Sequence, residues 1–235
     1  VPTDGNGVPL GYCQEDVEDL ARCLTGWTFD IDWVWQQPGT TGAFVYRNDL
    51  HSTEQKILLG TTIPAGGTAA ADGTAALNVL ANHPATARFI AKKLCRRFIG
   101  DFPPQSIIDS AAALFRSTSA APDQLKQVMR HILLSNEFKA AWGEKIKRPF
   151  EVMVSAMRAT GAEFRFYSQF PYPNDWNTWH VDMQDTSSLH WLYEKGNHEI
   201  FGWHPPNGHP DVRGAWQASS PRVATWRTLN WLADQ

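Results

Sequence analysis

Apolar residues at a helical spacing open the chain. Between residues 17 and 24 they fall at i, i+3, i+4 and i+7, the spacing that brings side chains to one face of an α-helix. The positions concerned are Val17, Leu20, Ala21 and Leu24. Gly26 can adopt the left-handed conformation that ends many helices. We therefore expect a helix before Gly26, with Trp27 folding back over its end.

The pattern changes after this corner. Residues 28–46 alternate aromatic and polar side chains around Pro38-Gly39, which predicts a β-hairpin or an ordered loop. Residues 56–60 predict a short strand that ends at a glycine, and residues 61–71 predict a loop of small residues.

Helical spacing returns at Asp72 and continues to the end of the chain. Asp72 or Thr74 can cap a helix over residues 75–82, and Pro84 suits the first position of the next one. Further helices are expected over residues 84–98, 107–115, 122–133, 149–161 and 186–195, and after Pro221. Their inward positions should include Leu125, Val128, Ile132, Val223, Trp226, Leu229 and Trp231. The sequence predicts a single all-α domain over residues 1–235, a multi-helix orthogonal or array-like bundle with long aromatic, Pro/Gly-rich loops and one short β-hairpin.

Composition narrows the function classes. The chain has 235 residues, of which 43% are hydrophobic and 19% charged, and its net charge is -3. This balance is typical of a globular protein and argues against a broad electrostatic contact with nucleic acid. We expect no membrane span, because no apolar run has the necessary length. The sequence also lacks the nucleophile elbow, the phosphate loop and the dinucleotide-binding fingerprint.

Tryptophan is the compositional outlier, with eleven residues, most of them after residue 175. Indole rings either pack cores and corners or form surfaces on which flat ligands such as sugar rings stack. Both interpretations stay open. The ligand-binding candidates are Trp27, Trp176, Trp179, Trp203 and Trp216.

Histidine is concentrated between residues 180 and 211. Imidazole and carboxylate groups are common ligands of zinc and related divalent metals. The candidate ligands are His180, His190, His198, His204, His209 and Asp211. Their spacing matches no known zinc signature, so exposed turn histidines remain the alternative to a metal or acid–base site.

The three cysteines do not indicate the redox compartment. Cys13 and Cys23 are too far apart to form a disulfide within one straight helix. Cys95, next to Leu94 in a predicted helix, is expected to be a small buried apolar residue.

Several segments together resemble the bacterial domain-of-unknown-function 1800 proteins. They are Tyr12–Trp27, His51–Gly60, His83–Leu94, Lys147–Glu151, Gly202-Trp203, Pro205–Gly208 and Trp216. Two positions depart from the family pattern, because Ser52 stands where an aspartate is typical and Phe150 stands where a leucine is typical.

The resemblance implies that this chain corresponds to the C-terminal half of a longer, exported protein. It therefore implies an extracytoplasmic setting and a partner, which is either the N-terminal half or another subunit. It implies no reaction. We expect a cell-surface or periplasmic binding module for a polysaccharide or similar polymer. The alternatives are a hydrolytic or metal-assisted enzyme that uses the His-rich region, and a structural module that needs a partner chain.

The same resemblance places Asp16 near His51, with Lys56 close by. A carboxylate that holds an imidazole can act as a general base, so these three residues are the catalytic candidates. A structural pair that fixes a loop is the alternative interpretation.

Overall fold

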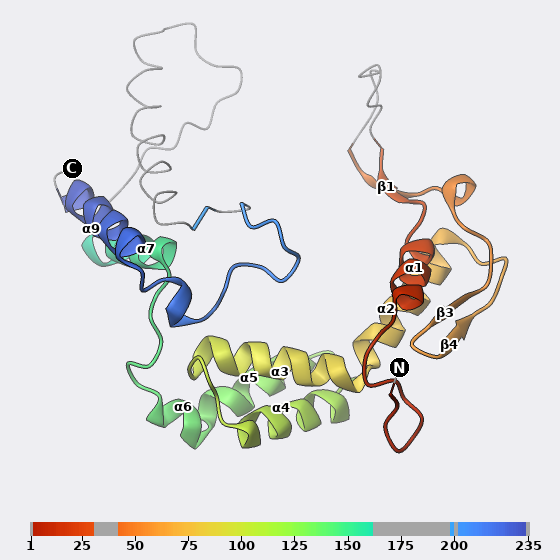
Figure 1. The fold of residues 1–235 in the computed structure, drawn as a ribbon, viewed down its shortest axis with the longest axis horizontal. Coiled ribbons are helices and arrows are strands. Elements are labelled where there is room, and N and C mark those ends of the chain that lie inside the picture. The colour runs from red at the N-terminus through yellow and green to blue at the C-terminus, as the bar shows by residue number, and fades with distance from the viewer. Residues whose placement is uncertain (1, 31–41, 162–197, 200–201, 234–235) are drawn as a thin grey trace, which may run out of the picture. The chain divides into compact units, whose positions relative to one another are not determined.

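The computed structural model describes residues 2–30, 42–161, 198–199 and 202–233. Most of these residues are helical, and the strands form two short antiparallel pairs (Figure 1). This confirms the predicted helix-rich class. The chain divides into two compact units, the first made of Val1–Lys93 with Ile108–His131 and the second of Leu94–Ile107 with Ile132–Gln235.

Helix α1 (Gln14–Cys23) begins the first unit. The expected helix is present, but the predicted face is only partly covered. Cys23 is fully buried, whereas Val17 is 46% exposed and Ala21 is exposed. Gly26 has a φ of +80°, as expected for the residue that ends this segment, and a Cβ atom there would overlap the carbonyl of Arg47.

The first strand pair lies within the predicted hairpin. Strand β1 (Trp27–Phe29) pairs with β2 (Phe44–Tyr46), with Trp27 opposite Tyr46. The Trp27 ring contacts both Phe44 and Tyr46 edge-on. Its Nε1 donates to the carbonyl of Ala69 at 2.7 Å, so the indole lies against α2.

The second pair corrects one prediction. Strand β3 (Lys56–Leu58) confirms the expected strand, and it pairs with β4 (Thr61–Ile63) inside the segment predicted as loop. Leu59 and Gly60 both have positive φ, which matches a tight hairpin turn between the two strands. The short 3-10 helix η1 (Asn48–Leu50) precedes this pair.

Helix α2 (Ala69–Asn82) starts earlier than predicted. Thr68 is its N-cap, and the Thr68 hydroxyl accepts a hydrogen bond from the backbone N–H of Ala71. Asp72 therefore lies inside the helix and caps nothing. A core cluster beside α2 contains Cys23, Leu58, Ile63 and Ala76.

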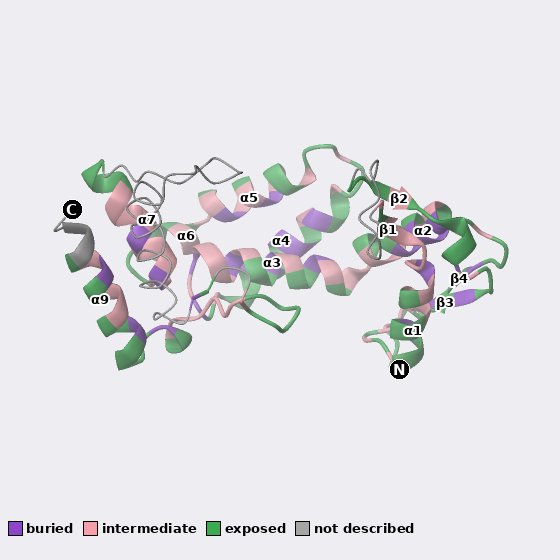
Figure 2. Cartoon of the chain, turned by 90° about the horizontal axis from the view of Figure 1, so that it is seen from above, coloured by how far each residue is buried: buried purple, intermediate pink, exposed green. Residues whose placement is uncertain are grey.

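Three further helices follow: α3 (Pro84–Phe98), α4 (Gln105–Ser117) and α5 (Gln124–Leu134). Buried positions recur along each of them (Figure 2). Pro84 begins α3 as predicted, and Cys95 is fully buried on it. Val128 and Ile132 are buried on α5, but Leu125 is 58% exposed, contrary to expectation.

The second unit contains α6 (Asn136–Ala140), α7 (Pro149–Thr160), the 3-10 helix η2 (Arg213–Ala215) and α9 (Ser219–Ala233). Helices α7 and α9 pack against each other (Figure 1). On α9 the buried residues include Pro221 and Thr228, whereas Val223 and Trp226 are 45% and 64% exposed. The prediction that both side chains pack inward was wrong.

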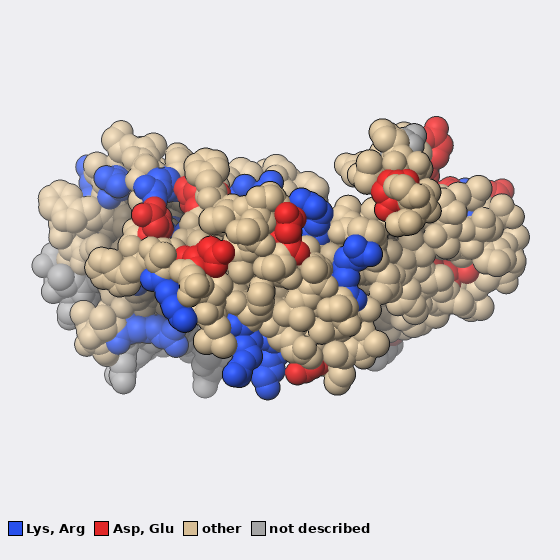
Figure 3. Space-filling model, turned by 90° about the horizontal axis from the view of Figure 1, so that it is seen from below, with Lys and Arg blue, Asp and Glu red and all other residues tan. Residues whose placement is uncertain are grey.

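The helix expected over residues 186–195 lies outside the described residues. No helix in the described ranges is long and apolar enough to cross a membrane. On the face drawn in Figure 3, acidic side chains lie among the basic ones.

Candidate functional site

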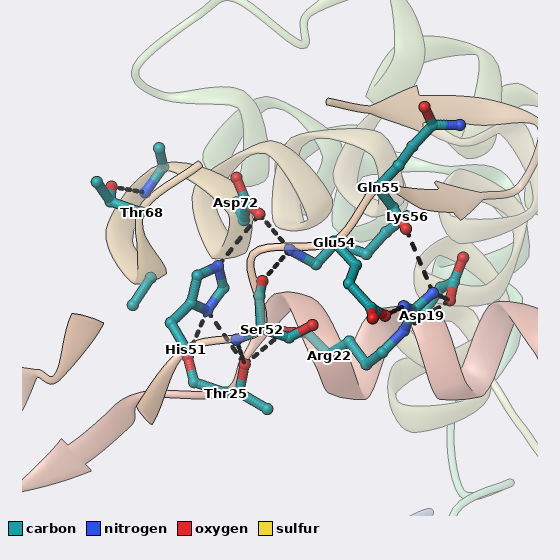
Figure 4. Close-up of polar contacts among 12 residues, drawn as sticks. Asp19, Arg22, Thr25, His51, Ser52, Glu54, Gln55, Lys56, Thr68 and Asp72 are labelled. Atoms are coloured by element: carbon teal, nitrogen blue, oxygen red, sulfur yellow. Dashed lines mark hydrogen bonds and ion pairs between the residues drawn. The ribbon is translucent and has the colours of Figure 1, made fainter. Parts of the chain in front are cut away.

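A buried group of three charged or polar side chains lies in the first unit (Figure 4). Lys56 Nζ is 2.6 Å from Asp72 Oδ2, and His51 Nε2 is 3.1 Å from the same oxygen. The three side chains are 0%, 5% and 1% exposed in the order Lys56, Asp72, His51. Burial raises the pKa of Asp72, but hydrogen bonds from Lys56 and His51 outweigh it and lower the pKa below its usual value.

Thr25 fixes the other side of the His51 ring. Nδ1 of His51 lies 2.9 Å from the carbonyl oxygen of Thr25, which only accepts hydrogen bonds, so Nδ1 carries a proton. The Thr25 hydroxyl also accepts from the backbone N–H of Ser52. The group therefore joins the corner after α1, the segment that leads into β3, and α2.

Asp16 does not hold His51. Its carboxylate accepts hydrogen bonds from the backbone N–H of Leu59 at 2.7 Å and of Cys13 at 2.9 Å. The structure thus brings His51 and Lys56 together, as the catalytic prediction requires, but supplies Asp72 as their carboxylate. Three side chains that are buried and bonded to one another suit a structural clamp better than a general base, which must reach a substrate.

Sequence reasoning missed Asp72, although a signal was present. Its neighbours along one face of α2 are Ala69, Gly73 and Ala76, all small and all buried. A carboxylate at a position that shares a face with small residues points into the core, where it needs a buried partner.

The second unit contains an ion-pair network centred on Glu151 at the start of α7. Glu151 Oε1 is 2.5 Å from Arg97 Nη2 and 2.6 Å from Arg148 Nη2. The backbone N–H of Arg148 also donates to Glu151, so this carboxylate caps the first turn of α7. Burial raises the pKa of Glu151, but these hydrogen bonds outweigh it and lower the pKa to about 2.

The network continues to the segment before η2. Lys145 Nζ contacts Asp101 Oδ1 at 3.2 Å and the carbonyl of Asp211 at 2.8 Å. The backbone N–H of Arg213 donates to Asp101 at 2.7 Å. Arg97 reaches Asp211 at 3.5 Å. Asp211, a predicted metal ligand, is therefore held by cations.

A cluster of imidazole and indole rings lies next to this network; we call it the ring cluster and define it as His198, Trp203, His209 and Trp216. His198 is 6% exposed, and its Nδ1 accepts from the backbone N–H of Phe150 at 3.3 Å. Burial, reinforced by the charge of Arg148, lowers the pKa of His198 to about 4.

His209 lies at the centre of the ring cluster. Its ring centroid is 4.7 Å from that of His198, 5.3 Å from Trp203 and 6.0 Å from Trp216. Nε2 donates to the carbonyl of Glu199 at 2.8 Å, so Nδ1 is the ring nitrogen that can accept a hydrogen bond. That Nδ1 atom is buried and has no hydrogen-bond partner among the residues that the structure describes.

The two tryptophans of the cluster differ in exposure. Trp216 is 6% exposed, and its Nε1 donates to the carbonyl of Pro210. Trp203 is 37% exposed, and its Nε1 donates to Asn207 Oδ1 at 2.9 Å. The Trp203 indole is therefore oriented by a hydrogen bond while part of it faces solvent.

The other predicted site residues divide into two groups. Trp176, Trp179, His180 and His190 lie outside the described residues. His204 is exposed, and Trp27 is half-buried against α2. Within the described part of the chain, no group of three or more His, Cys, Asp or Glu side chains could hold a metal ion. Cys13, Cys23 and Cys95 are free thiols.

Comparisons with known proteins give one match. The model of the DUF1800 family, described as a protein of unknown function, matches residues 5–235. No curated protein matches the chain. No solved structure matches it either. Since the matched range covers nearly all of the chain, this protein belongs to the DUF1800 family.

Proposed function

We propose that this chain is a polysaccharide-binding module and that the ring cluster of the second unit is its binding site. The observation that carries the proposal is the unpartnered Nδ1 of His209 beside the partly exposed indole of Trp203. A buried polar atom without a partner is rare in folded proteins and commonly indicates a missing water, ion or ligand.

Sugar rings present two kinds of surface, and the cluster offers a group for each. The C–H face of a pyranose is flat and apolar and can stack on an indole such as that of Trp203. A sugar hydroxyl can donate to the lone pair on Nδ1 of His209. One aromatic platform beside one oriented polar group is the usual composition of a ligand site.

Ion pairs hold the frame around the cluster, and this arrangement favours binding. The ion pairs of Glu151 and Asp211 fix the start of α7 and the segment that carries His209. Groups that are already held in place lose little conformational freedom when a ligand binds.

The setting of this activity rests on the family resemblance alone. We propose that the protein acts outside the cytoplasm, on a polymer of the cell surface or periplasm. Fractionation of the native host, with immunodetection of the protein, tests this part, and recovery only in the cytoplasmic fraction would contradict it.

The binding experiment is retention of the purified chain on microcrystalline cellulose, chitin and purified peptidoglycan. Trp203→Ala should weaken binding to the retaining polymer about tenfold, because it removes the stacking platform. His209→Gln should weaken it as well, because glutamine can replace the donor at the Nε2 position but supplies no acceptor at Nδ1.

Trp226→Ala is the matched control. It removes an indole that is 64% exposed on α9 of the same unit and lies outside the ring cluster. Its retention should equal that of the wild type. If the wild type is retained on none of the polymers, or if Trp226→Ala loses as much binding as Trp203→Ala, the proposal is wrong.

A second candidate function is that of a module completed by another chain. Two aromatic side chains of the second unit favour it, since Phe102 is 91% exposed and Trp142 is 94% exposed. Large apolar side chains that face solvent often mark protein interfaces. Light scattering should then show self-association of the chain, and Trp142→Ala should abolish it. If the chain is a monomer at all concentrations, self-association is excluded and the partner must be a different protein.

A further inference from the structure

A pocket of about 330 Å³ lies in the first unit, between α1, the turn after β3 and the junction of α2 with α3. Its walls are mainly aliphatic. They include Val17, Leu20, Leu58, Leu59, Leu80 and Ala85. The volume is within the range of small-molecule sites.

Asp16 is the acidic residue in this lining. Its carboxylate already accepts hydrogen bonds from the backbone N–H groups of Leu59 and Cys13. Burial raises the pKa of Asp16, but these two hydrogen bonds outweigh it and lower the pKa below its usual value. Asp16 is therefore ionised at neutral pH, and it disfavours an anionic group in the pocket.

The other polar side chains at the α2–α3 junction are also engaged. His83 Nε2 donates to the carbonyl of Pro9 at 3.0 Å, and its Nδ1 accepts from the backbone N–H of Ala85. The Thr86 hydroxyl donates to the carbonyl of Leu80 at 2.7 Å. These groups have their hydrogen bonds within the protein, so the occupant of the pocket needs few polar atoms of its own.

The rim of the pocket is accessible. Tyr12 is 74% exposed and Val17 is 46% exposed, and both belong to the lining. An apolar molecule can therefore enter from solvent without unfolding of α1, while the end of its chain reaches the walls formed by Leu58 and Leu80.

We propose that this pocket binds the aliphatic chain of a small neutral amphiphile. The aliphatic walls and the engaged polar groups favour a hydrocarbon chain, and the Asp16 carboxylate disfavours a negatively charged head group. A protein partner fits less well, because stable protein interfaces bury about 800 Å² on each side, whereas the feature here is a single pocket of about 330 Å³. This inference is independent of the polysaccharide site in the second unit.

The first experiment uses the fluorescence of N-phenyl-1-naphthylamine, a neutral apolar probe, with the purified chain. The probe should bind with about one-to-one stoichiometry, and 1-decanol should displace it. Decanoate, which has the same chain length, should be at least about tenfold weaker because of its charge. Absence of probe binding, or equal displacement by the alcohol and the acid, would overturn the proposal.

Two variants test whether the probe binds in this pocket. Ala85→Phe and Val17→Phe each put a larger side chain into the lining, and each should abolish saturable probe binding. Ala113→Phe is the control, because Ala113 is exposed on α4 and lies outside the lining. Circular dichroism of all three variants checks that they are folded, and either filling variant that is folded suffices for the test.

The same variants identify a competing occupant. If light scattering shows that the wild type is a dimer and that Ala85→Phe is a monomer, the pocket is covered by a second copy of the chain and the amphiphile proposal is wrong. If both filling variants bind the probe as the wild type does, the probe binds elsewhere and the proposal is equally wrong.

Discussion

The ammonium group of Lys56 lies 2.6 Å from the carboxylate of Asp72, and neither side chain is more than 5% exposed. The charged groups are therefore almost removed from water, and each is stabilised mainly by the other and by its local hydrogen bonds. Lys56 also donates to the carbonyl of Ser52, and Asp72 also faces His51. The ion pair between Lys56 and Asp72 therefore connects strand β3 to helix α2 through charge as well as through packing.

We expect Lys56→Met to lower the free energy of unfolding by about 3–5 kcal/mol, because it leaves the Asp72 carboxylate buried without its main counter-charge. Urea denaturation at pH 7 measures this change. Asp49→Asn is the control, since Asp49 pairs with Arg47 while both side chains are more than half exposed. That substitution should cost less than about 1 kcal/mol. Equal effects of the two substitutions would contradict the buried clamp.

Gly73→Ala should also destabilise the protein, although alanine normally favours a helix. Gly73 lies inside α2, and a Cβ atom there would overlap the Trp27 indole. We expect a cost of about 1–3 kcal/mol from the displaced ring. Gly214→Ala, where nothing lies within 4 Å of the added Cβ, should be nearly neutral in the same denaturation experiment. A stabilised Gly73→Ala variant would show that the indole does not pack on this helix.

The buried His198 should make stability depend on pH. Its pKa is lowered from 6.5 to about 4 by burial and by the charge of Arg148, so the unfolded chain binds a proton in this interval more readily than the folded one. Stability should therefore decrease as the pH falls from about 6.5 towards 4, and part of this loss belongs to His198.

His198→Asn tests this contribution, because asparagine does not titrate and can still accept the hydrogen bond from the backbone N–H of Phe150. The urea midpoint of this variant should change less between pH 7 and pH 5 than that of the wild type. His204→Asn removes an exposed imidazole instead and should keep the wild-type pH dependence. An unchanged pH dependence in His198→Asn would mean that the ring is not buried in solution.

Much of the helical architecture could be predicted from local signals. Pro84 and Pro149 mark the starts of α3 and α7, and Gly161, with a φ of +68°, marks the end of α7. These residues act through their own backbone preferences, so no tertiary information is needed. The start of α2 was misplaced because Thr68, Asp72 and Thr74 are all acceptable caps, and local sequence does not choose among them.

The parts that could not be predicted depend on contacts between distant residues. Whether Asp16 or Asp72 meets His51 is decided by how α1, β3 and α2 pack, which periodicity does not show. Val223 and Trp226 occupy helical positions suited to burial, yet their exposure depends on the neighbours of α9. Likewise, the His-rich composition near the C-terminal end left a metal or acid–base site and exposed turn histidines as alternatives. It did not indicate that Nδ1 of His209 would be buried with no hydrogen-bond partner among the described residues.

The central claim is that this nitrogen receives a hydrogen bond from a bound sugar. The most direct measurement is an NMR titration of the chain labelled with ¹⁵N-histidine, using cellohexaose or chitohexaose according to the polymer that retains the protein. The Nδ1 resonance of His209, assigned by its loss in His209→Gln, should shift saturably in the wild type and should need about tenfold more oligosaccharide to shift in Trp203→Ala. A wild-type resonance that does not move at saturating oligosaccharide would contradict the account.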